Sequence, residues 1–255
     1  MPRTRNPKPR IDPAVPSAGP ARIGVVEHAG TVAVIGDIHG RVDLLDALLR
    51  KLPRDAAIVV VGELCDRGPA TREVIDRLID RGATGARGNH EEWLIAWGRG
   101  RGFDRAALGF GGEATLTSYG SVGKDQREID AEGELVPRAH LAFLESLTHA
   151  VDLRVGDERY WVIHAGIPST TSFAGLDVEG VVPWLVKKRP ADLLWAFNDP
   201  EAMPPVDRPV IMGHVPRARP IDTGDAIAID TGCGTRKDGR LTAVVLPGRR
   251  FVSVG

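Results

Sequence analysis

Cysteine is scarce in this chain of 255 residues, which contains only Cys65 and Cys233. Two distant thiols exclude a disulfide framework, and neither cysteine belongs to a spacing that is typical of a zinc site. We therefore expect a cytoplasmic protein whose thiols stay reduced. Long apolar runs are also absent, and no stretch approaches the roughly 18 residues of a membrane-spanning helix. The sequence therefore predicts no membrane association.

Acidic residues are nearly absent from the first 22 residues, where Asp12 is the only one beside six prolines and five lysines or arginines. No apolar segment follows this stretch, so it does not match a secretory signal. It has too few apolar side chains to offset the entropy of ordering the chain. We therefore predict a disordered basic tail at residues 1–22 and a single domain at residues 23–255. Removing the tail's charge of +4 from the overall −1 leaves about −5 for the domain, which argues against nucleic acid as the main partner.

Short β-branched runs alternate with amphipathic segments in the first third of the chain. Residues 31–36 and 57–62 are continuous and apolar, as expected of strands that are buried on both faces. The leucines between them recur at helical spacing and end before Pro53, and a second helix is predicted at residues 71–81. This order predicts βαβ units and therefore a parallel sheet of an α/β protein.

The remainder of the chain is less regular. Residues 98–123 are rich in glycine, and we interpret them as loops or a cap region beside a site. A helix is predicted from leucine spacing at residues 138–147. Strands are predicted at residues 160–164, 210–213, 226–230 and 241–246, with a hairpin turn at Asp238 and Gly239 before the last of them.

Polar side chains follow five of these apolar segments at the point where each one ends. In open α/β sheets, ligands bind outside the carboxyl ends of the strands. The groups are carboxylates, imidazoles and an amide, each close to a glycine: Asp37, His39, Glu63, Asp66, Asn89, His90, His164 and His214. We therefore expect these side chains to share one edge of the fold.

Oxygen and imidazole ligands in this number suit divalent Mn, Fe or Zn. Asp37 and His39 can hold one ion, and a carboxylate after the second strand can bridge it to a second ion that Asn89, His164 and His214 complete. Two ions about 3.5–4 Å apart clamp a phosphoryl group and generate hydroxide from water.

Each of these residues alone has a simpler interpretation. An Asp or Asn after a strand is usually a turn former or a helix cap, and a lone histidine is more often a hydrogen-bonded core or surface residue. We keep this interpretation for His28, His140 and His149. For the four histidines at segment ends, the joint pattern favours a metal site.

The ordered blocks GDIHG, G-x-x-x-DRG, GNHE, HAG and GH resemble the signature of the PPP metallophosphatases, in the calcineurin-like phosphoesterase superfamily. Residues 111–120 (GGEATLTSYG) and 229–234 (IDTGCG) are similar to segments of the bacterial serine/threonine protein phosphatases. The resemblance covers residues 31–246. It implies a four-layer α/β/β/α sandwich with a dinuclear metal site, most simply two Mn²⁺ ions, at the carboxyl ends of the strands.

The resemblance also implies a role for each site residue. Asp37 and His39 would bind the first metal, and Glu63 stands at the bridging position. The second metal would be completed by three further ligands: Asn89, His164 and His214. His90, oriented by Asp66, corresponds to the general acid that protonates the leaving group after in-line attack by a metal-bridging hydroxide. Arg67 corresponds to a phosphate-binding arginine, whose planar fork suits phosphoryl oxygens.

Two positions depart from the family pattern. The bridging ligand is normally an Asp, and Glu63 carries one extra methylene, so we expect weaker or altered metal binding. A second phosphate-binding arginine commonly follows an LLW segment, but here Trp195 is followed by Ala196 and Phe197. Five cations are left as alternatives for this contact: Lys187, Lys188, Arg189, Arg217 and Arg219.

The leading hypothesis is a metal-dependent phosphomonoesterase that acts on phosphorylated Ser or Thr, or on Tyr, in proteins and on small phosphoesters in vitro. The second hypothesis is hydrolysis of dinucleoside polyphosphates by a related branch, which usually has Asn where Asp66 stands. The third is a catalytically weakened phosphate-binding module, suggested by Glu63 and the missing arginine. We interpret Cys65, inside the second block, as a small packed residue.

Overall fold

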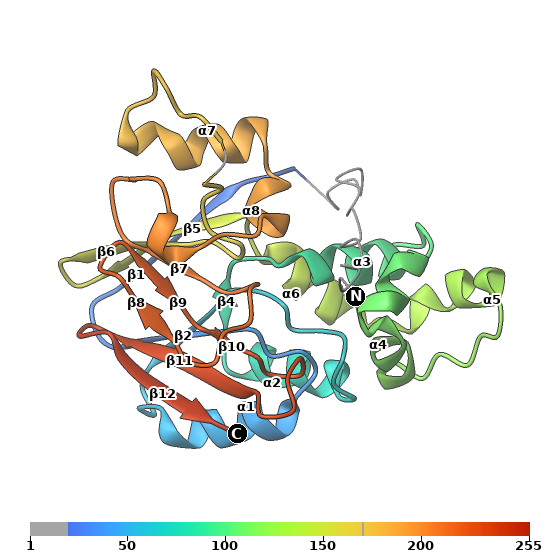
Figure 1. Cartoon of the computed structure of the whole chain (residues 1–255). Coiled ribbons are helices and arrows are strands. Elements are labelled where there is room, and N and C mark those ends of the chain that lie inside the picture. Colours follow the sequence, from blue (N-terminus) through green and yellow to red (C-terminus); the bar gives the residue numbers. More distant parts are fainter. Residues whose placement is uncertain (1–19, 170) are drawn as a thin grey trace, which may run out of the picture.

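The computed structural model describes residues 20–169 and 171–255 and arranges them as helices, two sheets and further helices in layers (Figure 1). Residues 1–19, which form most of the predicted tail, lie outside the described residues. At the end of that tail, the Arg22 carbonyl accepts a hydrogen bond of 3.1 Å from the His149 amide. Within the described ranges, no helix is both long and apolar enough to cross a membrane.

The first sheet contains the predicted βαβ units. Its order is β10-β11-β2-β3-β4, with β12 paired to β11. The pairs β2–β3 and β3–β4 are parallel, whereas β11 runs antiparallel to β2. The strands and the two crossover helices span β2 (Val32–Ile35), α1 (Val42–Lys51), β3 (Ala57–Val60), α2 (Thr71–Asp80), β4 (Thr84–Gly85), β10 (Asp230–Thr231), β11 (Arg240–Leu246) and β12 (Arg250–Val254).

Both faces of this sheet are buried, which explains its continuous apolar strands. Successive side chains of a strand point to opposite faces. Ala33 and Ile35 therefore pack with the leucines of α1 in one core, while Val32 and Val34 pack against the second sheet in another. The β-branched run that predicted a doubly buried strand is confirmed.

The second sheet has the order β1-β5-β6-β7-β9-β8. Its outer face packs on α7 and α8 through a third apolar core, opposite to the side that α1 and α2 cover (Figure 1). Its elements span β1 (Ile23–His28), β5 (Ala150–Val155), β6 (Glu158–Val162), α7 (Val181–Lys188), α8 (Asp192–Trp195), β7 (Val210–Met212), β8 (Ile221–Asp222) and β9 (Ala226–Ala228). The four-layer α/β/β/α sandwich is thereby confirmed.

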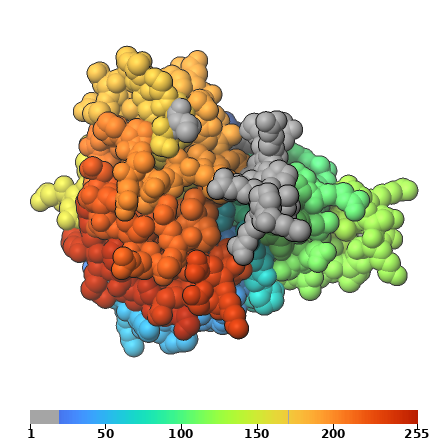
Figure 2. Space-filling view, in the orientation of Figure 1, coloured from blue at the N-terminus to red at the C-terminus, as the bar shows by residue number. Residues whose placement is uncertain are grey.

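A helical segment between β4 and β5 extends the fold to one side of the two sheets, and Figure 2 shows the part with α4 and α5 projecting from the body. It comprises α3 (Asn89–Gly98), the 3-10 helix η1 (Arg105–Phe110), α4 (Gly112–Ser118), α5 (Gln126–Ala131), the 3-10 helix η2 (Glu132–Leu135) and α6 (Arg138–Ser146). The interpretation of residues 98–123 as loops is therefore wrong in part. Gly111, at φ 92°, ends η1 and caps α4, which buries Thr115 and Leu116. The short 3-10 helices η3 (Val178–Gly180) and η4 (Pro200–Ala202) lie beside the second sheet's helices in sequence.

The predicted strand at residues 226–230 is also wrong in part, because it divides between the sheets. Ala226–Ala228 pairs with β7 in the second sheet, and Asp230–Thr231 pairs with β11 in the first. The chain passes between the layers at Ile229, whose amide still donates to Met212 O at 2.9 Å. One apolar run therefore joins both sheets close to their shared edge.

Candidate metal centre

The eight polar residues predicted to share an edge do converge, but they come from both sheets and not from one. The loops after β2, β3 and β4 meet those after β6 and β7. At the meeting point, the His214 amide donates to Asp37 Oδ2 at 3.0 Å. Gly213 allows this approach, because a Cβ there would lie 2.0 Å from Asp37 Oδ1.

The first ligand group, which we call the inner triad, consists of Asp37, His39 and Glu63. One ligand atom from each lies within 4.8 Å of the others, and all three residues are buried. His39 Nδ1 donates to the Cys65 carbonyl at 2.9 Å, which leaves Nε2 as the lone-pair nitrogen, 2.8 Å from Glu63 Oε2. A histidine whose other nitrogen is held by a carbonyl is the usual arrangement of a metal ligand.

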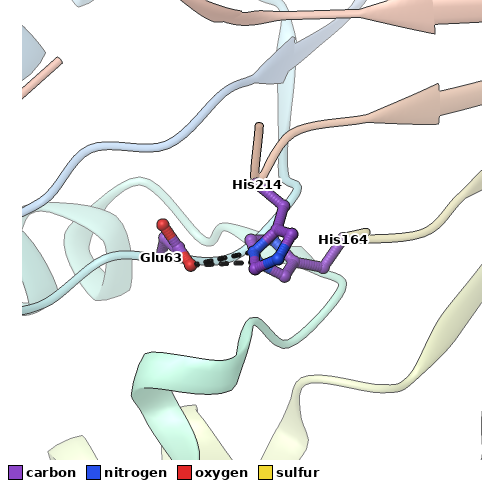
Figure 3. A group of neighbouring side chains, drawn as sticks. All are labelled: Glu63, His164 and His214. Carbon is purple, nitrogen blue, oxygen red and sulfur yellow. Dashed lines mark hydrogen bonds and ion pairs between the residues drawn. The ribbon is translucent and has the colours of Figure 1, made fainter. Parts of the chain in front are cut away.

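The second group, which we call the outer triad, consists of Glu63, His164 and His214 and meets the same 4.8 Å criterion. Figure 3 shows the Glu63 carboxylate directed at the two imidazole rings. His164 Nδ1 donates to the Val61 carbonyl at 3.0 Å, so its Nε2 lone pair faces Glu63 Oε1 at 3.1 Å. Asn89 Oδ1 lies 3.1 Å from the same Nε2 and faces only acceptor atoms. Glu63 therefore belongs to both triads.

The donor atoms of both triads fit divalent cations. The oxygen and nitrogen atoms of both triads face one another with their lone pairs, and too few hydrogen-bond donors lie between them. A bound cation stabilises such an arrangement. Among the described residues, Asp37 Oδ1 and His214 Nε2 are buried without a hydrogen-bond partner. Such unpaired buried atoms are costly unless a ligand satisfies them. These residues therefore form a candidate centre for two ions that share one carboxylate.

The pKa values of the two carboxylates, Asp37 and Glu63, shift in opposite directions. Burial raises the pKa of Asp37 well above its ordinary value, and the nearby Asp230 and Glu63 raise it further. Burial also raises the pKa of Glu63, but His90, His39 and His164 lower it more, so it ends well below its ordinary value. Burial lowers the pKa of His39, but Glu63 outweighs this and the net pKa is raised. In the metal-free site, these directions favour the charged form of Glu63 and the protonated form of Asp37.

The predicted acid pair lies beside the triads. His90 Nδ1 is 2.6 Å from Asp66 Oδ2, and His90 Nε2 points toward Glu63 Oε1 at 3.6 Å. Asp66 thus fixes the imidazole so that Nε2 faces the candidate ions. Arg67 is exposed and, like Glu63 and His90, lines a cavity beside the triads, as expected of a residue that meets the substrate.

Several site residues hold an uncommon backbone conformation. Among the described residues, six non-glycine residues have positive φ, and five of them are predicted site residues: His39, Glu63, Asp66, Arg67 and His214. Glu63, at φ 56°, is held by Glu91, whose carboxylate accepts from the amides of Glu63 at 3.0 Å and Leu64 at 2.8 Å. Such strain persists only where the surroundings fix it, and it gathers at functional sites.

Two supporting residues were missed by the sequence analysis. Glu91 is the last letter of the GNHE block, and only its place in that block could have indicated it. Thr115 lies in the GGEATLTSYG segment, where its hydroxyl donates to Asp66 Oδ1 at 2.6 Å and accepts from the Asp66 amide at 2.9 Å. The motif itself was the signal, but its distance from Asp66 in sequence concealed the contact.

The remaining histidines do not join the centre. His140 is a buried structural residue, bonded to Tyr119 Oη at 2.9 Å and to Asp76 Oδ1 at 2.8 Å. His28 Nδ1 accepts from the Gly30 amide at 3.0 Å. Burial lowers the pKa of His149 to about 4, and Arg87 and Arg22 lower it as well. Cys65 is fully buried, which confirms that it packs as a small residue.

The centre opens into a cavity of about 170 Å³. Its polar lining includes Glu63, Arg67, Asn89, His90, His214 and Asp230, and its apolar lining includes Phe110, Trp195, Phe197 and Pro216. Of the described residues that line it, Arg67 is the only arginine or lysine. Arg217 instead donates to the Asn198 carbonyl at 3.1 Å, and Arg189 pairs with Asp192 at 2.7 Å. Neither of them is among the described residues that line the cavity.

This fold, with ligand triads at the strand ends, has the features of a metallophosphoesterase. A family model described as calcineurin-like phosphoesterase matches residues 30–243. The chain therefore belongs to the calcineurin-like phosphoesterase family, whose members use divalent metals.

Curated relatives divide between two activities. PrpE from Halalkalibacterium halodurans, an asymmetrical bis(5'-nucleosyl)-tetraphosphatase, is 29% identical over 242 residues, which cover 87% of this chain and 92% of that protein. Serine/threonine-protein phosphatase 2 from Escherichia coli is 28% identical over 166 residues, covering 63% and 70%. The solved structure of a protein proposed to be a diadenosine tetraphosphatase superposes with a TM-score of 0.60 at 22% identity, covering 92% and 97%. The family match establishes a phosphoesterase, and the division among the relatives leaves its substrate open.

Proposed function

We propose that the protein is a metal-dependent phosphomonoesterase that removes phosphate from Ser, Thr or Tyr side chains of proteins. The observation that carries this proposal is the position of the Asp66–His90 pair, which faces the carboxylate that both triads share. A general acid beside a candidate dinuclear centre is the arrangement that phosphoester hydrolysis requires.

In this proposal each group has a defined task. Asp37, His39 and Glu63 hold one ion, and Glu63, Asn89, His164 and His214 hold the other. When bound, the ions supply an activated water and neutralise phosphoryl charge. Arg67 binds and orients the phosphoryl oxygens through its guanidinium. The Asp66 carboxylate accepts a hydrogen bond from His90 Nδ1 and so orients the ring, and His90 donates a proton from Nε2 to the leaving oxygen.

The cavity size favours a monoester over a dinucleotide. Typical ligand pockets hold roughly 300–1,000 Å³, whereas this cavity holds about 170 Å³. A phosphoryl group with the first atoms of its leaving group fits such a volume. Both nucleosides of a dinucleoside tetraphosphate would lie outside it. Hydrolysis of such dinucleotides is nevertheless the second candidate, because the 29%-identical PrpE relative covers most of the chain.

The test supplies phosphopeptides and diadenosine tetraphosphate to the full chain, with Mn²⁺ or with chelator, and measures released phosphate and nucleotide. We expect Mn²⁺-dependent release from the phosphopeptides. Removing a general acid typically costs 10²–10⁴-fold, so His90→Asn should lower turnover by at least about 100-fold. Cleavage of the dinucleotide alone would refute the protein-phosphatase proposal, and no cleavage of either substrate would favour a phosphate-binding module.

A further inference from the structure

An aromatic surface borders the cavity where the family pattern places its second phosphate-binding arginine. The residue that follows Trp195 and Ala196 is Phe197, whose ring lies 5.4 Å from the His214 ring. Phe197 is 69% exposed and lines the cavity together with Trp195 and Phe110. We call these three residues the aromatic wall.

A phenyl ring cannot replace the missing guanidinium. It carries no hydrogen-bond donor and no positive charge, so it does not neutralise a phosphoryl oxygen. It offers a flat apolar face, on which another ring stacks or packs edge to face. Arg67 is the one arginine or lysine that lines the cavity among the described residues, so a single guanidinium is available there for a phosphoryl group. Beyond the candidate ions and Arg67, further contacts are available to the part of the substrate beyond the phosphorus.

The wall begins beside the acid that protonates the leaving group. The Phe110 ring lies 6.2 Å from the His90 ring at an angle of 90°. Trp93 connects this end to the rest of the wall, since its ring is 5.6 Å from Phe110 and 5.5 Å from Trp195. Aromatic side chains therefore lie directly beside the His90 imidazole.

The distance between ring and phosphorus decides which substrate uses this wall. In an aryl phosphate, the ring is bonded directly to the ester oxygen, so it lies next to the phosphoryl group, within reach of the aromatic side chains that line the cavity. In a nucleotide, the ribose separates the base from the phosphate and carries it out of the cavity. In phosphoserine, one methylene follows the oxygen and no ring is present. Of these substrates, the aryl ester holds its ring closest to the phosphoryl group.

We propose that the aromatic wall binds the phenol ring of phosphotyrosine, so that aryl phosphomonoesters are preferred over alkyl ones. This inference rests on the proposed phosphomonoesterase function. In the reaction, the bond between phosphorus and the phenol oxygen breaks, and an oxygen from water bonds to phosphorus. The phenol oxygen takes its proton from His90, and a proton from the water restores the acid. The products are tyrosine and inorganic phosphate.

The test uses the full chain with Mn²⁺ and two peptides of one sequence that carry either phosphotyrosine or phosphoserine at the same position. The readout is the ratio of kcat/KM between the two peptides, because a ratio cancels changes in metal content or folding. A stacked aromatic contact corresponds to roughly 10-fold in affinity. We therefore expect Phe197→Ala to lower the ratio about 10-fold and Phe197→Tyr to keep it.

Two further variants sharpen the result. Val122→Ala removes another exposed apolar side chain, 80% accessible and not part of the cavity lining, and should leave the ratio unchanged. Phe197→Arg restores a guanidinium at this place and should move the ratio toward phosphoserine.

An unchanged ratio in Phe197→Ala, with phosphoserine still hydrolysed, would overturn the inference and leave the proposed function standing. No hydrolysis of either peptide by the wild-type protein would remove the proposed function and the inference together. A third arm with diadenosine tetraphosphate detects the competing occupant. If Phe197→Ala impairs only that substrate, the wall binds a nucleobase and the phosphotyrosine assignment is wrong.

Discussion

The two triads share Glu63 but differ in how the chain builds them. The inner triad is wholly buried, and its residues follow the adjacent parallel strands β2 and β3, within 27 residues of sequence. The outer triad takes His164 and His214 from the other sheet, and His214 is only partly buried. The inner triad is thus a product of one βαβ unit. The outer triad forms only when the two sheets pack face to face.

The largest effect is expected where the triads overlap. Glu63→Ala removes the carboxylate that contacts His39 at 2.8 Å and His164 at 3.1 Å, so both candidate ion sites lose a ligand. Mutation of a residue that only supports a metal ligand costs 10–100-fold in metal affinity or activity. Because Glu63 is itself a candidate ligand of both ions, we expect metal affinity and activity to fall by more than about 100-fold. Metal analysis after dialysis against Mn²⁺ should find almost no bound ion. His214→Ala is the matched comparison and should keep the inner ion. Equal stoichiometry in the two variants would contradict the shared role of Glu63.

An intermediate effect is expected in the pH dependence of stability. Since the folded-state pKa of Asp37 is raised, the metal-free protein holds a proton that the unfolded chain releases. Its stability should therefore fall as pH rises above about 4, through the raised pKa. The pKa of His39 is also raised, so stability falls further above about pH 6.5. The slope of stability against pH that is due to Asp37 is therefore best compared between pH 5 and 6.5.

Thermal unfolding of the protein in the presence of a chelator, at a series of pH values, measures how its stability changes with pH. Asp37→Asn should flatten the slope of Tm against pH. Each kcal/mol of unfolding free energy that no longer depends on pH corresponds to about 2–4 °C in Tm. His214→Gln alters the more exposed triad and should keep the wild-type slope. Mn²⁺ should raise the Tm of the wild type at neutral pH and that of Asp37→Asn much less. A wild-type slope in Asp37→Asn would show that this carboxyl is not the group that retains the proton.

The smallest effect is expected from shortening the shared ligand. Glu63→Asp withdraws the carboxylate by one carbon–carbon bond, about 1.5 Å. Glu91 still holds the backbone at this position, so the ligand stays directed at both triads. We expect Mn²⁺ affinity to rise, in keeping with the family's preference for Asp, and turnover to change by less than about 10-fold. Calorimetric titration of each variant with Mn²⁺ measures the change in affinity. Weaker binding than in the wild type would mean that the backbone has adapted to the longer side chain.

The first sheet, which carries the inner triad, was predicted better from the sequence than the second sheet. Strands β2 and β3 carry their ligands directly after β-branched runs, so motif and strand end coincide. Strands β1 and β5 pair across a separation of more than a hundred residues, with Ile23 opposite Ala150, and nothing local indicates that contact. Helix α3 was not predicted because it is buried on nearly all sides, so its polar first turn and its apolar Trp93, Leu94 and Ile95 give no amphipathic period.

The candidate ligands were all named from sequence, but their surroundings were not. Each ligand lies within a short glycine-containing block, so its type and spacing could be read locally. The aromatic wall combines Phe110 from η1 with two residues around the end of α8, and only the folded chain brings them together. The same is true of Thr115 and Asp66. Substrate preference therefore depends on contacts that no single motif contains.

The left-handed backbone at His39, Glu63, Asp66, Arg67 and His214 has a consequence for anyone who tries to make this protein more heat-resistant. Each such residue gives up about 1–2 kcal/mol that glycine would not. A selection for folding alone would therefore favour glycine at these five positions and discard the ligands and the substrate-binding guanidinium. Thermal robustness and turnover compete at the same atoms, so stabilising changes belong in α5, α7 or the outer strands, away from the strand ends.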